Sequence, residues 1–199
     1  MKRFVPFPFY KWLMRTIFSS GREFSDLPHR RWITEEMFPY FAAGNPGSVV
    51  FVGCAPYTWH YERLLRDRGT DYITIDPAPN TRVWGSSHHY VGFVQDLYKL
   101  LPAHSVDVVI MIGIYGFGIA NDQQLHEALG SIHKLLKPGG VFVFSWNNDI
   151  STDPQYHPDL IRQFQHVELG ALPKRKEFKT LVLDFYRALP ADQHSNAKE

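Results

Sequence analysis

Several absences limit what this chain can be. It contains one cysteine, Cys54, so no disulfide can form within it, as is usual in a reducing compartment such as the cytoplasm. Its formal net charge is only +1, so nothing global indicates a protein that binds nucleic acid. The ten histidines show no spacing typical of metal ligands. We therefore expect a cytoplasmic protein with no metal site and no nucleic-acid partner.

The chain also has no apolar run long enough to cross a membrane. Residues 4–18 are aromatic and apolar, but two basic residues and two prolines interrupt them, so neither a membrane span nor a signal peptide is predicted. Residues 1–31 carry seven basic residues against two acidic ones. Two interpretations stay open. One is an amphipathic helix that touches a membrane or a partner. The other, which we favour, is a helical extension that packs on the domain and covers the ligand site or a homodimer face.

What is present suits a globular protein with a sizeable core. The chain has 199 residues, of which 44% are hydrophobic and 21% charged, values typical of a single folded domain. The turn Gly44-Asn-Pro-Gly47 marks where the main domain begins. Within the segment before it we expect short helices, a break at Asp26-Leu-Pro28 and a helix start at Thr34. The predicted parts are a helical N-terminal extension at 1–47, the main domain at 48–190 and a flexible tail at 191–199.

Apolar runs alternate with helical patterns from residue 48 to residue 146. Strands are predicted at 48–52, 72–75, 88–94, 106–112 and 141–146, with a last strand at 179–189. Helices are predicted at 58–68 and 159–167, and after Asn121, which forms a capping box with Gln124. Gly113 to Gly118 reads as a tight turn, and Lys137-Pro-Gly-Gly140 as a helix end. The alternation predicts an α/β fold with a doubly wound, mostly parallel sheet of about six to seven strands and helices on both faces. Ligands of such sheets bind beyond the carboxyl ends of the strands.

The turn after the first predicted strand has an incomplete glycine pattern. Gly53 is followed by Cys54, and the sequence continues as Ala55-Pro56-Tyr57. A pyrophosphate requires close approach of the backbone, which glycines allow, whereas Pro56 removes an amide donor and Tyr57 adds bulk. This turn therefore counts against a dinucleotide. Asp76, at the end of the second predicted strand, either binds a ligand or only closes the Asp-Pro turn, and we favour ligand binding.

Five segments carry a resemblance to a known family. They are Phe51-Val-Gly-Cys-Ala55, Ile75-Asp76, Gln95-Asp-Leu-Tyr-Lys-Leu-Leu-Pro102, Ser105-Val-Asp-Val-Val-Ile110 and Leu136-Lys-Pro-Gly-Gly-Val-Phe142. Together they resemble the class I S-adenosylmethionine-dependent methyltransferases over residues 48–146. The resemblance implies a Rossmann-like fold and S-adenosyl-L-methionine as the cofactor. Two positions depart from the family pattern: Phe51 stands where an acidic residue is usual, and Ala55-Pro56-Tyr57 replaces the Gly-x-Gly continuation.

The resemblance also implies roles for particular residues. The backbone of Gly53, Cys54 and Ala55 would pass under the methionine part of the cofactor. Because the turn departs from the family pattern, either Tyr57 and Thr58 supply replacement contacts or the cofactor binds weakly or not at all. Asp76 would accept hydrogen bonds from both ribose hydroxyls, a task that suits an acceptor-only carboxylate. The remaining cofactor-binding candidates are Pro77 at the adenine, Asp96 at its amino group, Leu97 against its ring, and Gly113 to Tyr115 at the methyl side. Asp96 could instead cap the helical turn of Leu97 to Leu101, and Cys54 is expected to be a small buried group.

The expected reaction is methyl transfer to an oxygen or nitrogen atom of a small-molecule acceptor. Such a reaction depends mainly on holding donor and acceptor in line, and it needs a base only if the acceptor must lose a proton. The candidates for that base have no motif behind them: His88, His89, Tyr115 and Asp149. Two alternatives stay open. One is a degenerate, non-catalytic domain that binds cofactor or a partner chain, and the other is a different nucleotide-using α/β enzyme.

Overall fold

The computed structural model describes residues 7–17, 26–66 and 68–190. They form two compact units that divide between Val94 and Gln95. The predicted boundary near residue 47 is not tested by this division and stays a prediction. The predicted tail at 191–199 lies outside the described residues.

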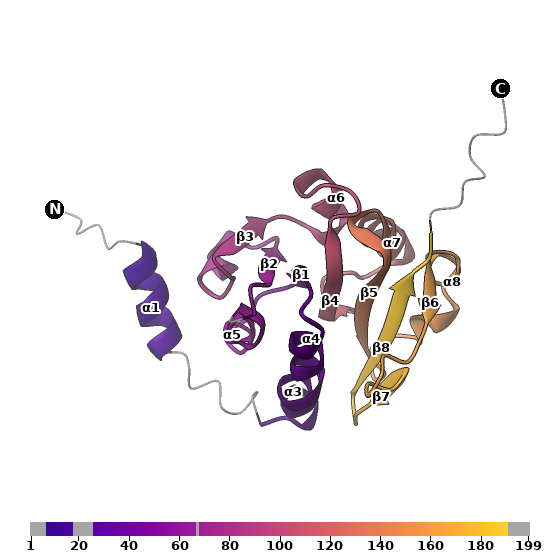
Figure 1. The fold of residues 1–199 in the computed structure, drawn as a ribbon, viewed down its shortest axis with the longest axis horizontal. Coiled ribbons are helices and arrows are strands. Elements are labelled where there is room, and N and C mark those ends of the chain that lie inside the picture. The colour runs from indigo at the N-terminus through magenta and orange to yellow at the C-terminus, as the bar shows by residue number, and fades with distance from the viewer. Residues whose placement is uncertain (1–6, 18–25, 67, 191–199) are drawn as a thin grey trace. The chain divides into compact units, whose positions relative to one another are not determined.

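The first unit begins with helices (Figure 1). Helix α1 spans Phe7–Ile17, and α3 (Pro28–Trp32), the π-helical turn η2 (Ile33–Met37) and α4 (Phe38–Gly44) follow one another without leaving helical backbone angles. The predicted break is present, since α3 begins at Pro28. The predicted helix start at Thr34 is wrong. Its hydroxyl donates to the carbonyl of Arg30, 3.1 Å away, inside a continuous helix, as serine and threonine do within helices.

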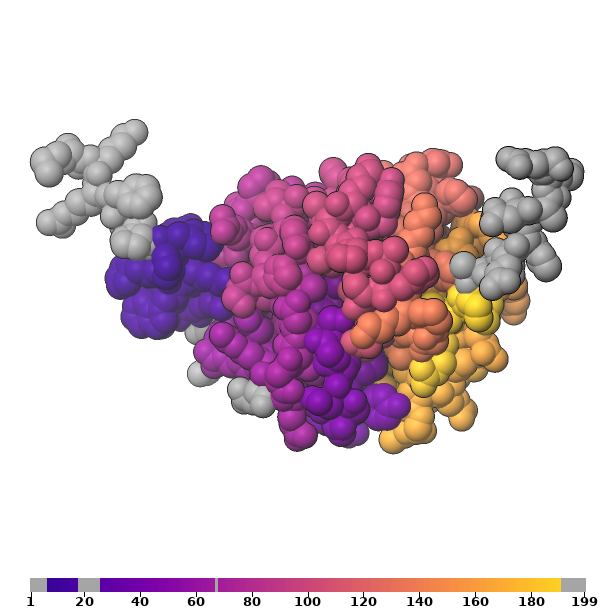
Figure 2. Space-filling view, turned by 45° about the horizontal axis from the view of Figure 1, so that its top comes forward, coloured from indigo at the N-terminus to yellow at the C-terminus, as the bar shows by residue number. Residues whose placement is uncertain are grey.

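Three parallel strands form the sheet of the first unit. They are β1 (Ser48–Val52), β2 (Asp71–Asp76) and β3 (His88–Val91), in the order β3-β2-β1. Helix α5 (Tyr61–Arg66) connects β1 to β2. Only the short 3₁₀ helix η3 (Pro79–Val83) connects β2 to β3, where a loop was predicted because prolines flank its start. In the space-filling view α1, in indigo, lies against the part of this unit that contains η3 (Figure 2).

Aromatic side chains fill the core of the first unit around Phe51. Its ring centroid lies 5.5 Å from that of Tyr61 on α5 and 6.3 Å from that of Tyr72 on β2. Phe51 is almost fully buried. The position where the family has an acidic residue therefore belongs to the hydrophobic core of this chain.

The second unit contains the remaining parallel pair of strands. Strands β4 (Val106–Tyr115) and β5 (Leu136–Asn147) pair in parallel, with α6 (Leu97–Leu100) before β4 and α7 (Asp122–Leu135) between them. The predicted cap of α7 is confirmed. The side chain of Asn121 accepts a hydrogen bond from the amide of Gln124 at 2.9 Å, and this satisfies one of the free amides of the first turn.

Antiparallel pairing completes the second unit. Strand β8 (Leu181–Ala188) pairs antiparallel with β5, β6 (Phe164–His166) and β7 (Arg175–Glu177), after the short helices η5 (Pro154–Tyr156) and α8 (Pro158–Gln163). Asp184 on β8 is fully buried. It accepts hydrogen bonds from Trp146 Nε1 at 3.0 Å and from Arg175 Nε at 2.6 Å. A charged side chain in this position requires such partners.

Several predicted boundaries are wrong. The helix predicted at 159–167 ends at Gln163, because Phe164 adopts an extended conformation, pairs with Ala188 and packs on Phe142. This long-range pairing overrides the local helical pattern. The helix predicted at 58–68 is the shorter α5. Strand β4 continues to Tyr115, so the predicted glycine turn begins only at Gly116, and β5 begins at Leu136 rather than after Gly140.

The predicted fold class is confirmed. Strands alternate with helices along the chain, and β1–β2, β2–β3 and β4–β5 pair in parallel. The described residues form three strands in the first unit and five in the second, against about six to seven predicted in all. The additional strands are the short β6 and β7, whose pairing with β8 has no strong local signal.

Candidate functional site

The turn after β1 depends on one glycine. Gly53 has a φ of +87°, a conformation that residues with a side chain rarely adopt. Its amide donates to the carbonyl of Ile75 at 2.8 Å. The chain therefore turns at the carboxyl end of β1, directly beside the end of β2.

Asp76 holds this turn from the end of β2. Its Oδ2 accepts a hydrogen bond from the amide of Cys54 at 2.8 Å, and its Oδ1 accepts one from the amide of Ala78 at 2.9 Å. The side chain thus closes the turn that follows it, as one interpretation of the sequence proposed. Each carboxylate oxygen has two lone pairs, so each can accept one further hydrogen bond.

Thr58 closes the altered part of the turn. Its Oγ1 lies 3.0 Å from the amide nitrogen of Ala55 and 3.0 Å from the carbonyl oxygen of the same residue. Tyr57 lies beside the cation Arg30, whose Cζ is 4.2 Å from the centre of the tyrosine ring. Thr58 therefore fixes the backbone of the turn that lacks the usual glycines, and Tyr57 packs on α3.

Cys54 and His89 lie together beneath the same turn. Cys54 Sγ is 4.0 Å from His89 Nδ1, which is also 2.9 Å from Thr74 Oγ1. Burial, with Asp76 nearby, raises the pKa of the Cys54 thiol to about 12, so the thiol is neutral at physiological pH and a poor nucleophile. Burial lowers the pKa of His89, so its imidazole is neutral as well.

His88 lies at the other end of the strands. Its Nδ1 is 3.2 Å from Asp71 Oδ1 and its Nε2 is 3.0 Å from the hydroxyl of Tyr90. Asp71 begins β2, whereas Asp76 ends it. His88 therefore faces the amino end of β2, away from the turn at Gly53.

The predicted adenine contacts are distributed over both units. Pro77 follows Asp76 directly and is exposed. In the second unit, Asp96 Oδ1 accepts a hydrogen bond from Lys99 Nζ at 2.6 Å. Asp96 does not cap α6 through its side chain, so that alternative is not observed. Leu97 is fully buried.

The remaining candidates lie at the ends of β4 and β5. Gly113 has a φ of +71°, and its amide donates to Ser145 Oγ at 2.9 Å. The ring centroid of Tyr115 is 5.7 Å from that of Phe144. Asp149 lies in the exposed turn after β5. Gly113, Tyr115 and Asp149 thus occupy carboxyl ends of strands, as predicted.

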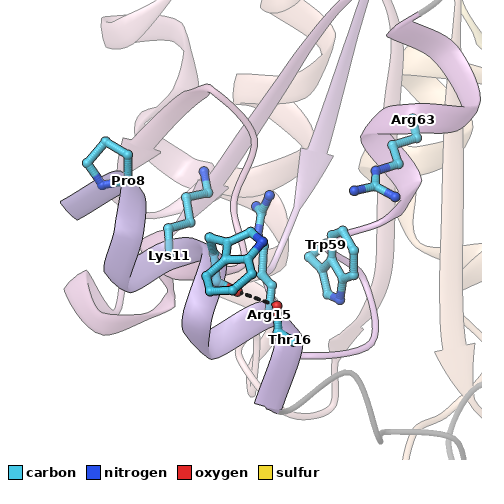
Figure 3. A pocket seen from close by; sticks show the side chains of 7 residues that line it. Pro8, Lys11, Arg15, Thr16, Trp59 and Arg63 are labelled. Atoms are coloured by element: carbon cyan, nitrogen blue, oxygen red, sulfur yellow. Dashed lines mark hydrogen bonds between the residues drawn. The ribbon is translucent and has the colours of Figure 1, made fainter. Parts of the chain in front are cut away.

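A pocket lies between α1 and the start of α5 (Figure 3). This α1 pocket has a volume of about 450 Å³. Its walls combine three cations with two tryptophans: Lys11, Arg15, Arg63, Trp12 and Trp59, with Pro8 and Thr16 at its edge. The sequence offered one signal, namely two basic residues four positions apart in an aromatic helix. It did not show that Arg63 would face them.

Arg15 and Lys11 attach α1 to the loop that leads into β3. Arg15 Nε donates to the carbonyl of Val83 at 2.9 Å, and its terminal nitrogen donates to the carbonyl of Gly85 at 2.6 Å. Lys11 Nζ donates to the carbonyl of Ser86 at 3.0 Å. Burial, assisted by the neighbouring Arg15, lowers the pKa of Lys11 to about 8. Burial also lowers the pKa of Arg15.

The described residues contain neither a cluster of metal-ligating side chains nor a membrane-spanning helix. No cluster of three or more histidine, cysteine, aspartate or glutamate side chains in this part of the chain could hold a metal ion. None of the helices described is long and apolar enough to cross a membrane.

Comparison with known proteins gives one family and one fold. Residues 52–144 match the model of the family described as "Methyltransferase domain". No curated protein matches the sequence significantly. The N-methyltransferase NodS from Bradyrhizobium japonicum WM9 has a similar structure, with a TM-score of 0.61 and 18% identity over 83% of this chain and 99% of that one.

Two further solved structures share the fold. The TehB-like S-adenosylmethionine-dependent methyltransferase from Corynebacterium glutamicum has a TM-score of 0.58 and 14% identity, over 84% of this chain and 100% of that one. The 1,6-didemethyltoxoflavin-N1-methyltransferase from Burkholderia thailandensis has a TM-score of 0.56 and 16% identity, over 96% of this chain and 93% of that one. These structures share the fold that the sequence predicted, and residues 52–144 resemble a methyltransferase domain.

Proposed function

We propose that this protein transfers a methyl group from S-adenosyl-L-methionine to an oxygen or nitrogen atom of a small molecule. The cofactor supplies a methyl group on a sulfonium sulfur, which keeps the electron pair of the broken bond while a lone pair of the acceptor forms the new one. The Burkholderia neighbour is named for N1-methylation of a small molecule and was crystallised with S-adenosylhomocysteine. Similarity of fold and the methyltransferase-domain match at residues 52–144 support the same class of reaction here.

The observation that carries the proposal is the arrangement of Asp76 at the Gly53 turn. Asp76 is held in place by two backbone amides, from Cys54 and Ala78. It retains acceptor capacity on both oxygens, as two neighbouring ribose hydroxyls require. In this proposal Asp76 binds the ribose, and the backbone from Gly53 to Ala55 supports the methionine part.

The family resemblance also assigns cofactor contacts to residues of the second unit. Asp96 and Leu97 would contact the adenine, and Gly113 to Tyr115 would line the methyl side, as the family resemblance implies. Lys99 pairs with Asp96, so cofactor binding at this position would compete with an exposed ion pair, which is weak.

Positioning, rather than base catalysis, carries the proposed mechanism. His88 faces the amino end of β2, and His89 is half-buried, with its Nε2 atom buried. Neither imidazole is placed to take a proton from an acceptor. An acceptor that is already nucleophilic at neutral pH needs only to be held in line with the methyl group. A proton that the acceptor loses after methylation passes to solvent.

Isothermal titration calorimetry with S-adenosylmethionine and S-adenosylhomocysteine tests the proposal. The wild-type chain should bind both, and Asp76→Asn should weaken binding about tenfold or more, because hydrogen bonds to a charged group contribute about 1.5–3 kcal/mol. Asp71→Asn changes a carboxylate at the opposite end of the same strand and is the matched control. It should leave the affinity unchanged.

The outcomes separate the proposal from its rivals. Absence of binding by the wild-type chain at millimolar ligand would refute it. Equal affinity of wild type and Asp76→Asn would refute the ribose contact alone. Because Asp76 also closes two turns, thermal unfolding of each variant must confirm that it is folded at the titration temperature.

A non-catalytic binding role is the second candidate. The observation that favours it is the altered Ala55-Pro56-Tyr57 turn, whose backbone is closed by Thr58. Cofactor binding without release of S-adenosylhomocysteine over a broad panel of acceptors would select this role. The homodimer through the N-terminal segment and the cytoplasmic location stay predictions.

A further inference from the structure

The lining of the α1 pocket has an unusual charge. Lys11 and Arg15 come from α1 and Arg63 from α5, and none of the described residues that line the pocket is a carboxylate. Glu62 is the carboxylate that acts on Lys11 and Arg15. Its Oε1 already accepts a hydrogen bond from Ser87 Oγ at 3.1 Å and lies 3.8 Å from Arg66. Three cations thus line one cavity, and the carboxylate that acts on Lys11 and Arg15 already has other partners.

Trp59 contacts two of these cations. The Cζ atom of Arg15 lies 5.2 Å from the centre of a Trp59 ring, and that of Arg63 lies 4.9 Å from it. Figure 3 shows Trp59 between α1 and Arg63. Two guanidinium groups around one ring repel each other, and an anion between them would remove that repulsion. Guanidinium groups bind carboxylates and phosphates through paired hydrogen bonds.

The size and the remaining lining indicate the kind of molecule. A volume of about 450 Å³ lies within the range of small-ligand pockets. Trp12 and Trp59 supply aromatic surface beside the cations, and this favours a planar ring over a free inorganic ion.

The pocket also lies next to the proposed cofactor turn. Lys11 and Arg15 both act electrostatically on Cys54, which follows Gly53. Trp59 lies immediately after Thr58, the residue that closes the same turn. A ligand in the pocket would therefore be close to the part of the first unit that we assign to the methionine portion of the cofactor.

We propose that the α1 pocket binds the anionic group of the methyl acceptor, and that the acceptor is a ring-bearing carboxylate or phosphate. This inference rests on the methyl transfer proposed above. Arg63 donates hydrogen bonds to the anion. Lys11 and Arg15, which also donate to backbone carbonyls, attract it by their charge, while Trp12 and Trp59 contact the ring. The atom of the acceptor that receives the methyl group is then determined by its distance from the anionic group.

Direct binding of simple probes tests the pocket without turnover. Benzoate and phenyl phosphate are titrated into the full chain at pH 7, with benzamide as the neutral probe, and followed by calorimetry. Both anions should bind, and benzamide should bind at least about tenfold more weakly because it lacks the charge. The ratio of the two anions distinguishes a carboxylate site from a phosphate site.

Variants of the cations locate the binding. Arg63→Gln should weaken the anionic probes about tenfold, and Lys11→Gln should do the same. Arg63 makes none of the hydrogen bonds that attach α1, so its variant leaves the docking of α1 intact. Arg31→Gln removes an exposed charge on α3 and is the control. It should not change the affinity for the probes.

Parallel titration of S-adenosylhomocysteine keeps the two proposals separable. Unchanged affinity for it in Arg63→Gln, with weaker benzoate binding, supports the acceptor pocket. Weaker S-adenosylhomocysteine binding with unchanged probe binding would overturn it, because the cations would then serve the cofactor. Wild-type binding of S-adenosylhomocysteine without the anionic probes would overturn the acceptor class and leave methyl transfer standing. Probe binding without S-adenosylhomocysteine binding would refute methyl transfer, and with it the acceptor role of the pocket.

Discussion

Substitution of Asp184 removes a charge from a fully buried position in the second unit. Its carboxylate accepts hydrogen bonds from Trp146 and from two nitrogens of Arg175, and lies 3.0 Å from His166 Nε2. Removing one partner of a buried ion pair costs about 3–5 kcal/mol. Arg175 keeps Asp153 as a second partner, at 2.8 and 3.1 Å. We therefore expect Asp184→Ala to lose about 3 kcal/mol, at the lower end of that range.

Asparagine at the same position should be less damaging. It keeps one acceptor oxygen and the volume of the side chain but loses the charge, so we expect Asp184→Asn to lose about 2 kcal/mol. Urea unfolding followed by circular dichroism measures both variants. With a slope of about 2–3 kcal/mol per molar urea, the midpoint of Asp184→Ala should fall by about 1 M or more. Asp149→Asn, at an exposed position, is the control and should stay within about 0.5 kcal/mol of wild type.

The dependence on pH provides a second test of the same network. Burial acts to raise the pKa of Asp184, but hydrogen bonds from His166, Arg175 and Trp146 outweigh it and lower that pKa. A lowered pKa in the folded state adds stability above the unfolded pKa, about 3.9, and this contribution is lost as pH falls through the folded value. The difference in the free energy of unfolding between wild type and Asp184→Asn should be largest at pH 7 and should shrink below about pH 4. If both variants lose less than about 1 kcal/mol of unfolding free energy at pH 7, Asp184 does not stabilise the fold as argued.

Two further predictions concern the first unit. Gly53→Ala should lower the free energy of unfolding by about 1–2 kcal/mol, because Gly53 has a φ of +87°. Thermal unfolding measures this loss. The control is Gly130→Ala inside α7, where an added Cβ meets nothing within 4 Å, and this variant should be more stable than wild type. Benzoate affinity should fall between pH 7 and pH 9, because the lowered pKa of Lys11, about 8, places its loss of charge in that range. The groups that act on Lys11 are Arg15, Glu62, Arg82 and Cys54. Calorimetry of Lys11→Gln should show a flat profile, and an equal fall in that variant would contradict the assignment.

Local signals account for what the sequence predicted correctly. The apolar run of β1, the turn at Gly53 and the cap at Asn121 each depend on residues within a few positions of one another. Asp76 was identified because a carboxylate ends an apolar run, although its hydrogen bonds to Cys54 and Ala78 require the tertiary fold. These features are fixed by backbone geometry that a short segment already specifies.

Long-range packing accounts for what the sequence could not predict. Residues 164–166 form β6 only because β8 offers a free edge, and their own pattern suits a helix. The pairing of Arg15 with Val83 and Gly85 spans 68 and 70 residues, and nothing near either segment signals it. The α1 pocket exists only when this distant contact has formed, so no local sequence motif indicates it.

The short connection between β2 and β3 explains why α1 is attached where it is. The 3₁₀ helix η3 has five residues, and the loop after it has backbone carbonyls that need donors. Arg15 and Lys11 supply donors to Val83, Gly85 and Ser86. No residue of helix α1 is fully buried, so polar contacts make up much of its attachment and the docking free energy is modest. An anion bound between α1 and Arg63 would add contacts between α1 and the rest of the first unit. Ligand binding and the docking of α1 are therefore thermodynamically linked, and each must strengthen the other by the same factor.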